Sequence, residues 1–185
     1  MIVNFSPKKL PEFLFYSRTL NKEKSLYYHR MFSSKTGEYL GEMITHPQDF
    51  YYFNLEVPGV RSLYIDYLKV FKRNEGLGTK FLDFAKTISK QNGLNGRLHL
   101  ISSDCYDKAN PPHVFYRKYG FDSRNVDKLI ELDNAISQPK HKFSFNNIAM
   151  FFPPKTQVEQ NFSQTKSFWK RLKQIVYKIY IHTLK

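Results

Sequence analysis

The sequence predicts an α/β fold, a mixed central sheet flanked by helices, in a domain that spans residues 1–152. Three observations lead to this prediction. Leu63 to Phe71 reads as a strand, Thr79 to Lys90 has a helical pattern, and Arg97 to Ser103 reads as a second strand. A strand, helix, strand unit joins parallel strands, usually by a right-handed crossover. Residues 25–45 upstream read as a hairpin, which makes the sheet mixed.

The N-terminal residues are expected to form a first strand and a first helix. Met1 to Phe5 is a short strand-like stretch. Pro11 to Leu20 begins with a proline and the acidic Glu12, both of which favour a helix N-terminus.

A hairpin and an irregular segment follow. Ser25 to Ser34 and Tyr39 to Thr45 are rich in β-forming residues and flank a turn at Lys35–Glu38. His46 to Val60 contains two prolines, Pro47 and Pro58, and should be less regular, although Phe50 to Val57 fits either a strand or an aromatic loop.

The central unit is better defined. The helix from Lys80 to Lys90 carries one apolar stripe with lysines opposite and should end near Asn92–Gly93. A loop, Asp104 to Pro112, follows the second strand, and its two prolines suit the first turn of the next helix.

The end of the domain is read more loosely. Asn125 to Ser137 fits a helix, but Leu129 to Leu132 also fits the start of a strand. Phe143 to Phe152 reads as the final strand, and Pro153–Pro154 marks the domain boundary.

Residues 153–185 are predicted to be a polar linker and a C-terminal basic amphipathic helix. Apolar residues of Gln164 to Leu184 recur near helical spacing, with lysines and an arginine mostly elsewhere on the helical wheel. Such a helix can dock on its own domain, pair with a sister chain in a homodimer, or lie on an anionic membrane.

Composition limits the protein class. The 185 residues suffice for one domain with a substantial core. The first nine residues lack the apolar region of a signal peptide, and the lone Cys105 allows no internal disulfide, so a cytoplasmic location is expected. The 29 Lys+Arg against 16 Asp+Glu give a net charge of +13, which suits an anionic partner such as RNA or a membrane surface, or reflects compositional bias.

A glycine-containing turn between the central strand and its helix suggests an anion site. Arg73-Asn74-Glu75-Gly76-Leu77-Gly78 leads into a helix N-terminus, where backbone N–H groups lack intrahelical partners. Gly76 and Gly78 allow positive φ angles and close backbone approach, and Arg73 and Lys80 add charge. Neither the Rossmann nor the Walker spacing occurs here, so a phosphate-bearing ligand of another kind is indicated.

A second motif narrows the ligand. Val114 to Phe121 reads as a short helix closed by Gly120, with Tyr116 to Phe121 spelling Y-x-x-x-G-F. With the R-x-x-G-x-G loop before it, this chain resembles the GNAT (Gcn5-related N-acetyltransferase) superfamily over roughly Ser62 to Phe121. The resemblance implies that an amine attacks the thioester of acetyl-CoA directly, without a covalent enzyme intermediate.

The resemblance also implies site residues. The backbone of Leu68, Lys69 and Val70, where the central strand parts from its neighbour, would bind the pantetheine arm and polarise the thioester carbonyl. The pyrophosphate would lie on the amides of Arg73, Asn74, Glu75, Gly76, Leu77, Gly78 and Thr79. Asn110 stands six residues before Tyr116, whereas many relatives have an asparagine seven before it, so its cofactor contact departs from the pattern.

Two residues are candidates for proton transfer. Tyr116 would protonate the departing thiolate, the alternative being a core tyrosine with a satisfied hydroxyl. Asp66 on the central strand would act as general base through water, the alternative being a solvated or salt-bridged aspartate. His99, His113 and Glu42 are weaker candidates, and no histidine has metal-ligand spacing.

Two functions therefore remain open. The first is an acetyl-CoA-dependent N-acetyltransferase that acts on a primary amine of a small molecule, peptide or protein. The second is a binding module that keeps the GNAT fold and binds RNA or an anionic membrane through its basic surface and tail helix.

Overall fold

The computed structural model describes residues 11–23, 25–50, 60–105, 110–138 and 143–153. The elements in chain order are β1 (Phe13–Asn21), β2 (Leu26–Ser33), β3 (Tyr39–Phe50), β4 (Val60–Val70), α1 (Leu77–Gln91), β5 (Leu98–Ser103), α2 (Pro112–Tyr119), α3 (Val126–Ser137) and β6 (Asn147–Phe152).

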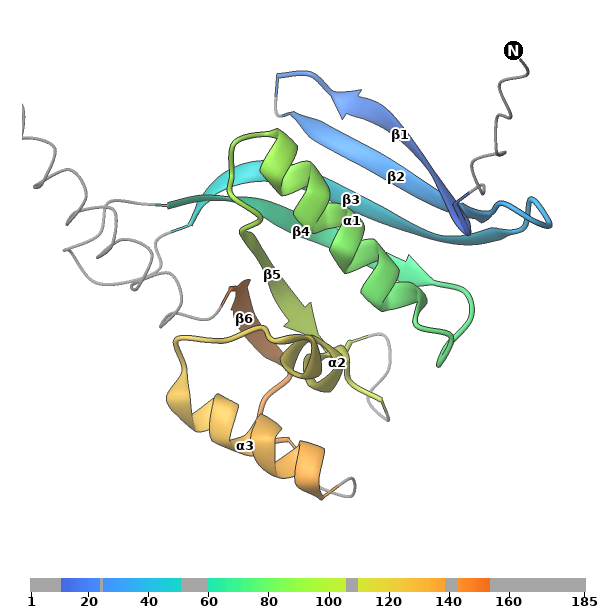
Figure 1. Ribbon diagram of the computed structural model, residues 1–185. Helices are drawn as coiled ribbons and strands as arrows, with labels where there is room; N and C mark the ends of the chain where they lie inside the picture. Colours follow the sequence, from blue (N-terminus) through green and yellow to red (C-terminus); the bar gives the residue numbers. More distant parts are fainter. Residues whose placement is uncertain (1–10, 24, 51–59, 106–109, 139–142, 154–185) are drawn as a thin grey trace, which may run out of the picture.

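The six strands form one sheet in the order of the sequence, β1-β2-β3-β4-β5-β6. The pairs β1/β2, β2/β3, β3/β4 and β5/β6 are antiparallel, whereas β4 and β5, which flank α1, are parallel. In Figure 1, α1 lies across one face of the β1–β4 part, and α2 and α3 lie beside β5 and β6. The predicted α/β class with a mixed sheet flanked by helices is confirmed.

The core lies between α1 and the sheet. The apolar stripe predicted for this helix is buried, with Phe81, Leu82 and Ala85 fully enclosed. Met31 and Met43 are fully buried in the same core cluster. Burying such side chains contributes roughly 1.5–3 kcal/mol each, so this contact fixes α1 on the sheet.

The helix predicted at Pro11 to Leu20 is wrong, because this segment forms strand β1. Its side chains alternate: Phe13 and Phe15 pack against the core, while Leu14 and Tyr16 are exposed. The ring of Phe15 stacks on Phe84 of α1 at 3.9 Å between centroids. Pairing with β2 and this stacking are contacts between distant residues, and they override the local helix-start signal.

The segment after the hairpin is more regular than predicted. Strand β3 does not stop at Thr45 but runs through Pro47 to Phe50. Its pairing with β2 ends at Thr45, so beyond that residue the described ladder of β3 is the one with β4. Proline is tolerated where a strand has an open edge, which explains why Pro47 does not end β3.

The structure decides two predictions for the C-terminal part of the domain, the element at Asn125 to Ser137 and the start of the last strand. Residues 126–137 form helix α3, capped by the Asn125 side chain, which accepts a bond from the Lys128 backbone N–H at 3.0 Å. The strand alternative at Leu129 to Leu132 is therefore wrong. Strand β6 begins at Asn147, later than the predicted Phe143, because Ser144 instead donates to the Glu131 carboxylate.

Several predictions lie outside the described residues: the strand at Met1 to Phe5, the reading of residues 51–57, and the C-terminal helix at Gln164 to Leu184. Among the described helices, none is both long and apolar enough to cross a membrane.

Candidate functional site

Strand β4 contains a bulge at Asp66. Ile44 pairs with Tyr67 and Thr45 pairs with Ile65, so Asp66 has no opposite residue on β3. The bulge shifts the inward-facing positions, which are Leu63 and Ile65 before it and Leu68 and Val70 after it. The strand predicted at Leu63 to Phe71 therefore forms with an interrupted alternation. Bulges of this kind re-aim a strand and are enriched near active sites.

Strand β4 also parts from β5 at this point. Their parallel ladder consists of the pairs Leu63/Leu98 and Tyr64/His99, after which no further pair is formed in the described strands. Leu68, Lys69 and Val70 keep their partners on β3. In the described strands, the β5 side of their backbone therefore has no ladder partner.

The loop after β4 has the backbone of an anion site. Asn74 and Gly76 have φ angles of 62° and 70°, and Gly76 is the N-cap of α1. The first helical bond runs from Lys80 N–H to the Gly76 carbonyl at 3.1 Å, so the amides before Lys80 precede the hydrogen-bonded helix. No acidic side chain lies in the first turn of α1. Left-handed residues followed by free first-turn amides bind anions.

Gly78 serves a different purpose from Gly76. A Cβ atom at Gly78 would lie 2.8 Å from Cζ of Phe115, so the glycine lets α2 approach the first turn of α1. A Cβ atom at Gly76 would meet nothing within 4 Å, so that residue is required for its φ angle alone. Of the two glycines, only Gly76 has the predicted positive φ, and the close approach seen at Gly78 is to the Phe115 ring of α2.

Tyr116 lies on α2 in the core. Its ring contacts Phe115 and Phe121, and its residue exposure is 8%. Burial raises the pKa of the Tyr116 hydroxyl well above its ordinary value, so the hydroxyl keeps its proton at neutral pH. Gly120 ends α2 with a φ of 108°, and Phe121 N–H donates to the Tyr116 carbonyl at 3.0 Å. The helix end is therefore built as the Y-x-x-x-G-F pattern predicted.

The other predicted residues are more exposed. Asp66, the bulge residue, is exposed on β4, and its charge adds to burial in raising the pKa of the neighbouring Tyr64. Asn110 is exposed just ahead of Pro111, the N-cap of α2. Arg73 and Thr79 are exposed on the loop and first turn.

The two histidines that are weaker candidates for a general base are buried and hydrogen-bonded. His99 and His113 are buried, with Nδ1 atoms 2.6 and 2.7 Å from the hydroxyls of Ser62 and Ser102. Burial lowers the pKa of both histidines, to about 4 for His99. Within the described residues, the Nε2 atom of His113 is buried without a hydrogen-bond partner.

Glu42 belongs to a polar network that the sequence did not reveal. Its carboxylate accepts from the hydroxyls of Tyr28 and Tyr39, the latter at 2.5 Å. These bonds, with the Tyr28 bond foremost, lower the Glu42 pKa, so this carboxylate is a poor proton acceptor at neutral pH. The residues of this network come from two strands, β2 and β3, so no local sequence motif predicts it.

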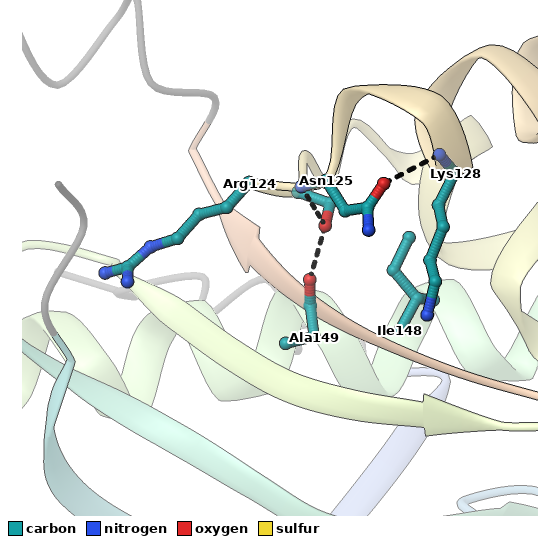
Figure 2. Close-up of a pocket in the computed structure, with 6 residues that line it drawn as sticks. Arg124, Asn125, Lys128, Ile148 and Ala149 are labelled. Atoms are coloured by element: carbon teal, nitrogen blue, oxygen red, sulfur yellow. Dashed lines mark hydrogen bonds between the residues drawn. The ribbon is translucent and has the colours of Figure 1, made fainter.

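Figure 2 shows a pocket at the start of α3, away from the predicted residues. It is lined by Ser123, Arg124, Asn125, Lys128, Ile148 and Ala149. The Ser123 hydroxyl donates to the Ala149 carbonyl at 2.8 Å, which ties the pocket floor to β6. Because its polar groups stabilise the cap of α3, this pocket is read as structural. The described residues contain no group of three or more potential metal ligands.

Most of the residues that the sequence predicts for the site lie on β4, the loop after it and α2. Asp66, Leu68 to Val70 and the loop lie in sequence along β4 and its exit. Gly78 and Phe115 bring the helix of Tyr116 against the start of α1.

Comparisons with known proteins give similar folds at low sequence identity. No protein-family model matches the chain, and no curated protein matches it. Among solved structures, the chain is similar to AtaTR bound with AcCoA, at 17% identity and a TM-score of 0.44 over 74% of either chain. It is also similar to the histone acetyltransferase HPA2 and related acetyltransferase from Corynebacterium glutamicum, at 14% identity and 0.42 over 72% of this chain and 68% of that one. Ard1 from Thermoplasma volcanium is similar at 18% identity and 0.37, over 66% and 68%.

Proposed function

We propose that this protein is an acetyl-CoA-dependent N-acetyltransferase that transfers an acetyl group to a primary amine by direct attack. The observation that carries the proposal is the parting of β4 from β5, which leaves one backbone edge of Leu68 to Val70 open directly before an anion-binding loop. A ligand that combines phosphates with a chain of amides fits this succession of groups. Bound acetyl-CoA would supply the thioester that an amine attacks.

The loop would hold the pyrophosphate. The left-handed φ angles at Asn74 and Gly76 turn successive amides toward one point, and the positive end of the α1 dipole adds to them. Arg73 and Thr79 are exposed in the loop and first turn, whereas the Lys80 Nζ atom lies 5.7 Å from the Phe13 ring centroid on β1. The exposed Glu75 brings one negative charge to the loop, so backbone amides rather than net charge would dominate the binding.

The open backbone of β4 would orient the arm and the thioester. Leu68 and Val70 pack inward against the core, so the strand is rigid where Lys69 lies between them. Rigid backbone donors aimed at a developing oxyanion are an effective form of transition-state stabilisation. The side chains of these three residues are less important than their position beside the open edge.

Proton transfer would involve Tyr116 and Asp66. The Oη atom of Tyr116 keeps its proton because burial raises its pKa, and it would donate that proton to the leaving sulfur. Asp66 at the bulge would take a proton from the attacking amine through water. Asn110, before the α2 helix, would add a cofactor contact.

Two phenylalanine substitutions on one helix test the role of Tyr116. We expect Tyr116→Phe to lower kcat by roughly 10²–10⁴-fold while acetyl-CoA still binds, since general acid catalysis contributes about that factor. Tyr119→Phe is the matched control, because Tyr119 lies on the same helix as Tyr116 and its hydroxyl donates to Asp83 of α1 at 2.7 Å. The measurement is acetyl-CoA turnover over a panel of polyamines, amino acids, peptides and aminoacyl-tRNA. Equal turnover in the Tyr116→Phe and Tyr119→Phe variants would remove the assignment.

A further inference from the structure

The face of β1–β4 opposite α1 carries a continuous row of cations and aromatic rings. His29 contacts Phe84 of α1 at 5.4 Å, so its neighbours Tyr28 and Arg30 point to the other side of the sheet. Arg18 pairs with Tyr28 across the β1/β2 ladder, and residues directly opposite share a face.

The row is made of stacked contacts. The Tyr28 ring lies between two guanidinium groups, with Arg18 and Arg30 carbons 5.2 and 5.1 Å from its centroid. Arg30 is also 5.7 Å from the Tyr39 centroid. We call the following set the cation–ring ladder: Arg18, Tyr28, Arg30, Tyr39, Phe71 and Lys69.

The far end of the cation–ring ladder reaches the exit of β4. Tyr39 and Phe71 have centroids 4.9 Å apart, and the Lys69 Nζ atom lies 5.4 Å from the Phe71 centroid. Glu42 fixes the middle of the row by accepting from the Tyr28 and Tyr39 hydroxyls. Lys69 lies directly opposite Glu42 on the β3/β4 ladder, and Arg30 pairs with Glu42 from β2. The three cations Arg18, Arg30 and Lys69 outnumber this one carboxylate, so the row keeps a net positive charge.

Part of this face is open to solvent. Tyr16, which pairs with Arg30 on the same face, is 61% exposed, and Phe71 is 45% exposed. Arg18 and Lys69 are also exposed. Exposed aromatic rings alternating with planar cations on an open sheet face are the combination that binds unstacked bases and phosphates.

We propose that this face is a docking surface for single-stranded nucleic acid, with bases stacking on its exposed rings and phosphates paired with Arg18 and Lys69. The charge of the face favours nucleic acid over two other possible occupants, the C-terminal residues of this chain and a second copy of the protein. Residues 154–185 carry seven Lys+Arg and one Glu, so the tail repels the row. A second copy would bring two cationic faces together, whereas a polyanion complements both the row and the net charge of +13.

The test measures fluorescence anisotropy of a short labelled single-stranded RNA with the full chain at several salt concentrations. We expect Arg18→Gln to weaken binding and to lower the salt slope by about one. Tyr16→Leu removes the exposed ring and keeps apolar area, and should weaken binding roughly 5- to 150-fold without changing the slope. Lys90→Gln, an equal charge change on the exposed end of α1, is the matched control and should leave binding within about twofold.

Other outcomes overturn the proposal. They are an absence of binding by the full chain, equal losses in Arg18→Gln and Lys90→Gln, an unchanged affinity in Tyr16→Leu, or equal binding of the duplex with the same sequence. A parallel titration with phosphatidylserine vesicles can overturn the proposal in a further way. If the Tyr16 and Arg18 variants lose affinity for the vesicles but bind RNA as well as the wild type, the face binds a lipid surface instead. Neither variant touches the residues proposed for catalysis or acetyl-CoA.

Discussion

Two buried histidines should make the fold sensitive to mild acid. His29 is 2% exposed, with Nδ1 2.7 Å from the Ser17 hydroxyl and Nε2 2.9 Å from the Thr45 hydroxyl. His99 is 4% exposed and lies 2.6 Å from the Ser62 hydroxyl. Burial lowers the pKa of both from 6.5 to about 4, because the charged imidazolium loses its hydration.

The sign and size of the effect follow from these values. Each histidine binds a proton more readily in the unfolded chain, so the stability it contributes is complete above the unfolded pKa of 6.5 and is lost as the pH falls toward 4. Since one pKa unit corresponds to about 1.4 kcal/mol, each histidine costs roughly 2 kcal/mol by about pH 5. Together they would remove about 4 kcal/mol, a large part of the 5–15 kcal/mol typical of a domain.

Urea unfolding at about pH 7.5 and about pH 5 measures this loss, in a range where carboxylates titrate little. The double variant His29→Gln/His99→Gln cannot gain these protons. It should be less stable than the wild type at neutral pH but show a much smaller loss on acidification. The single variant His29→Gln should keep more than half of the wild-type loss, because His99 and the buried His113, whose pKa burial also lowers, still gain protons on unfolding. Equal losses in wild type and double variant would refute the assignment to these two histidines.

Two further substitutions test the packing that positions the site. Gly41→Ala would place a Cβ atom 2.5 Å from the Lys69 carbonyl oxygen and 2.9 Å from the Phe81 ring. It should destabilise the fold by roughly 1–3 kcal/mol in chemical denaturation, and an unchanged midpoint would contradict the close approach of β3 and β4. Asn125→Ala removes the cap of α3 and should cost about 1 kcal/mol, whereas Asn125→Ser should retain most of it.

The parts of the site that depend on neighbouring residues could be predicted from the sequence. The left-handed Gly76 before α1 and the left-handed Gly120 after α2 occur where the glycines predicted them. The sequence also indicates the shift of inward-facing residues at Asp66. After Leu63 and Ile65, the next aliphatic residue is Leu68 and not residue 67, which is Tyr67. A change from every second to every third residue along a strand is what one extra, bulged residue produces.

The parts that depend on distant residues could not be predicted. Pro11 to Leu20 has a local signal for a helix start, and pairing with β2 together with the Phe15–Phe84 stack made it a strand. The cation–ring ladder and its Glu42 carboxylate arise from the register of several strands at once. A periodicity read along a single segment contains no information on such cross-strand neighbours.

The most direct test of the proposed coenzyme site is calorimetric titration of acetyl-CoA into wild type, Gly76→Ala and Gly93→Ala. Gly76 and Gly93 have φ angles of 70° and 72°, and a Cβ atom on either would meet nothing within 4 Å. Both substitutions should therefore cost about the same stability, roughly 1–2 kcal/mol. Only Gly76 lies in the loop, so its variant should bind acetyl-CoA about 5- to 30-fold more weakly while Gly93→Ala binds like the wild type. No binding by the wild type, or equal affinities in the two variants, would contradict the account.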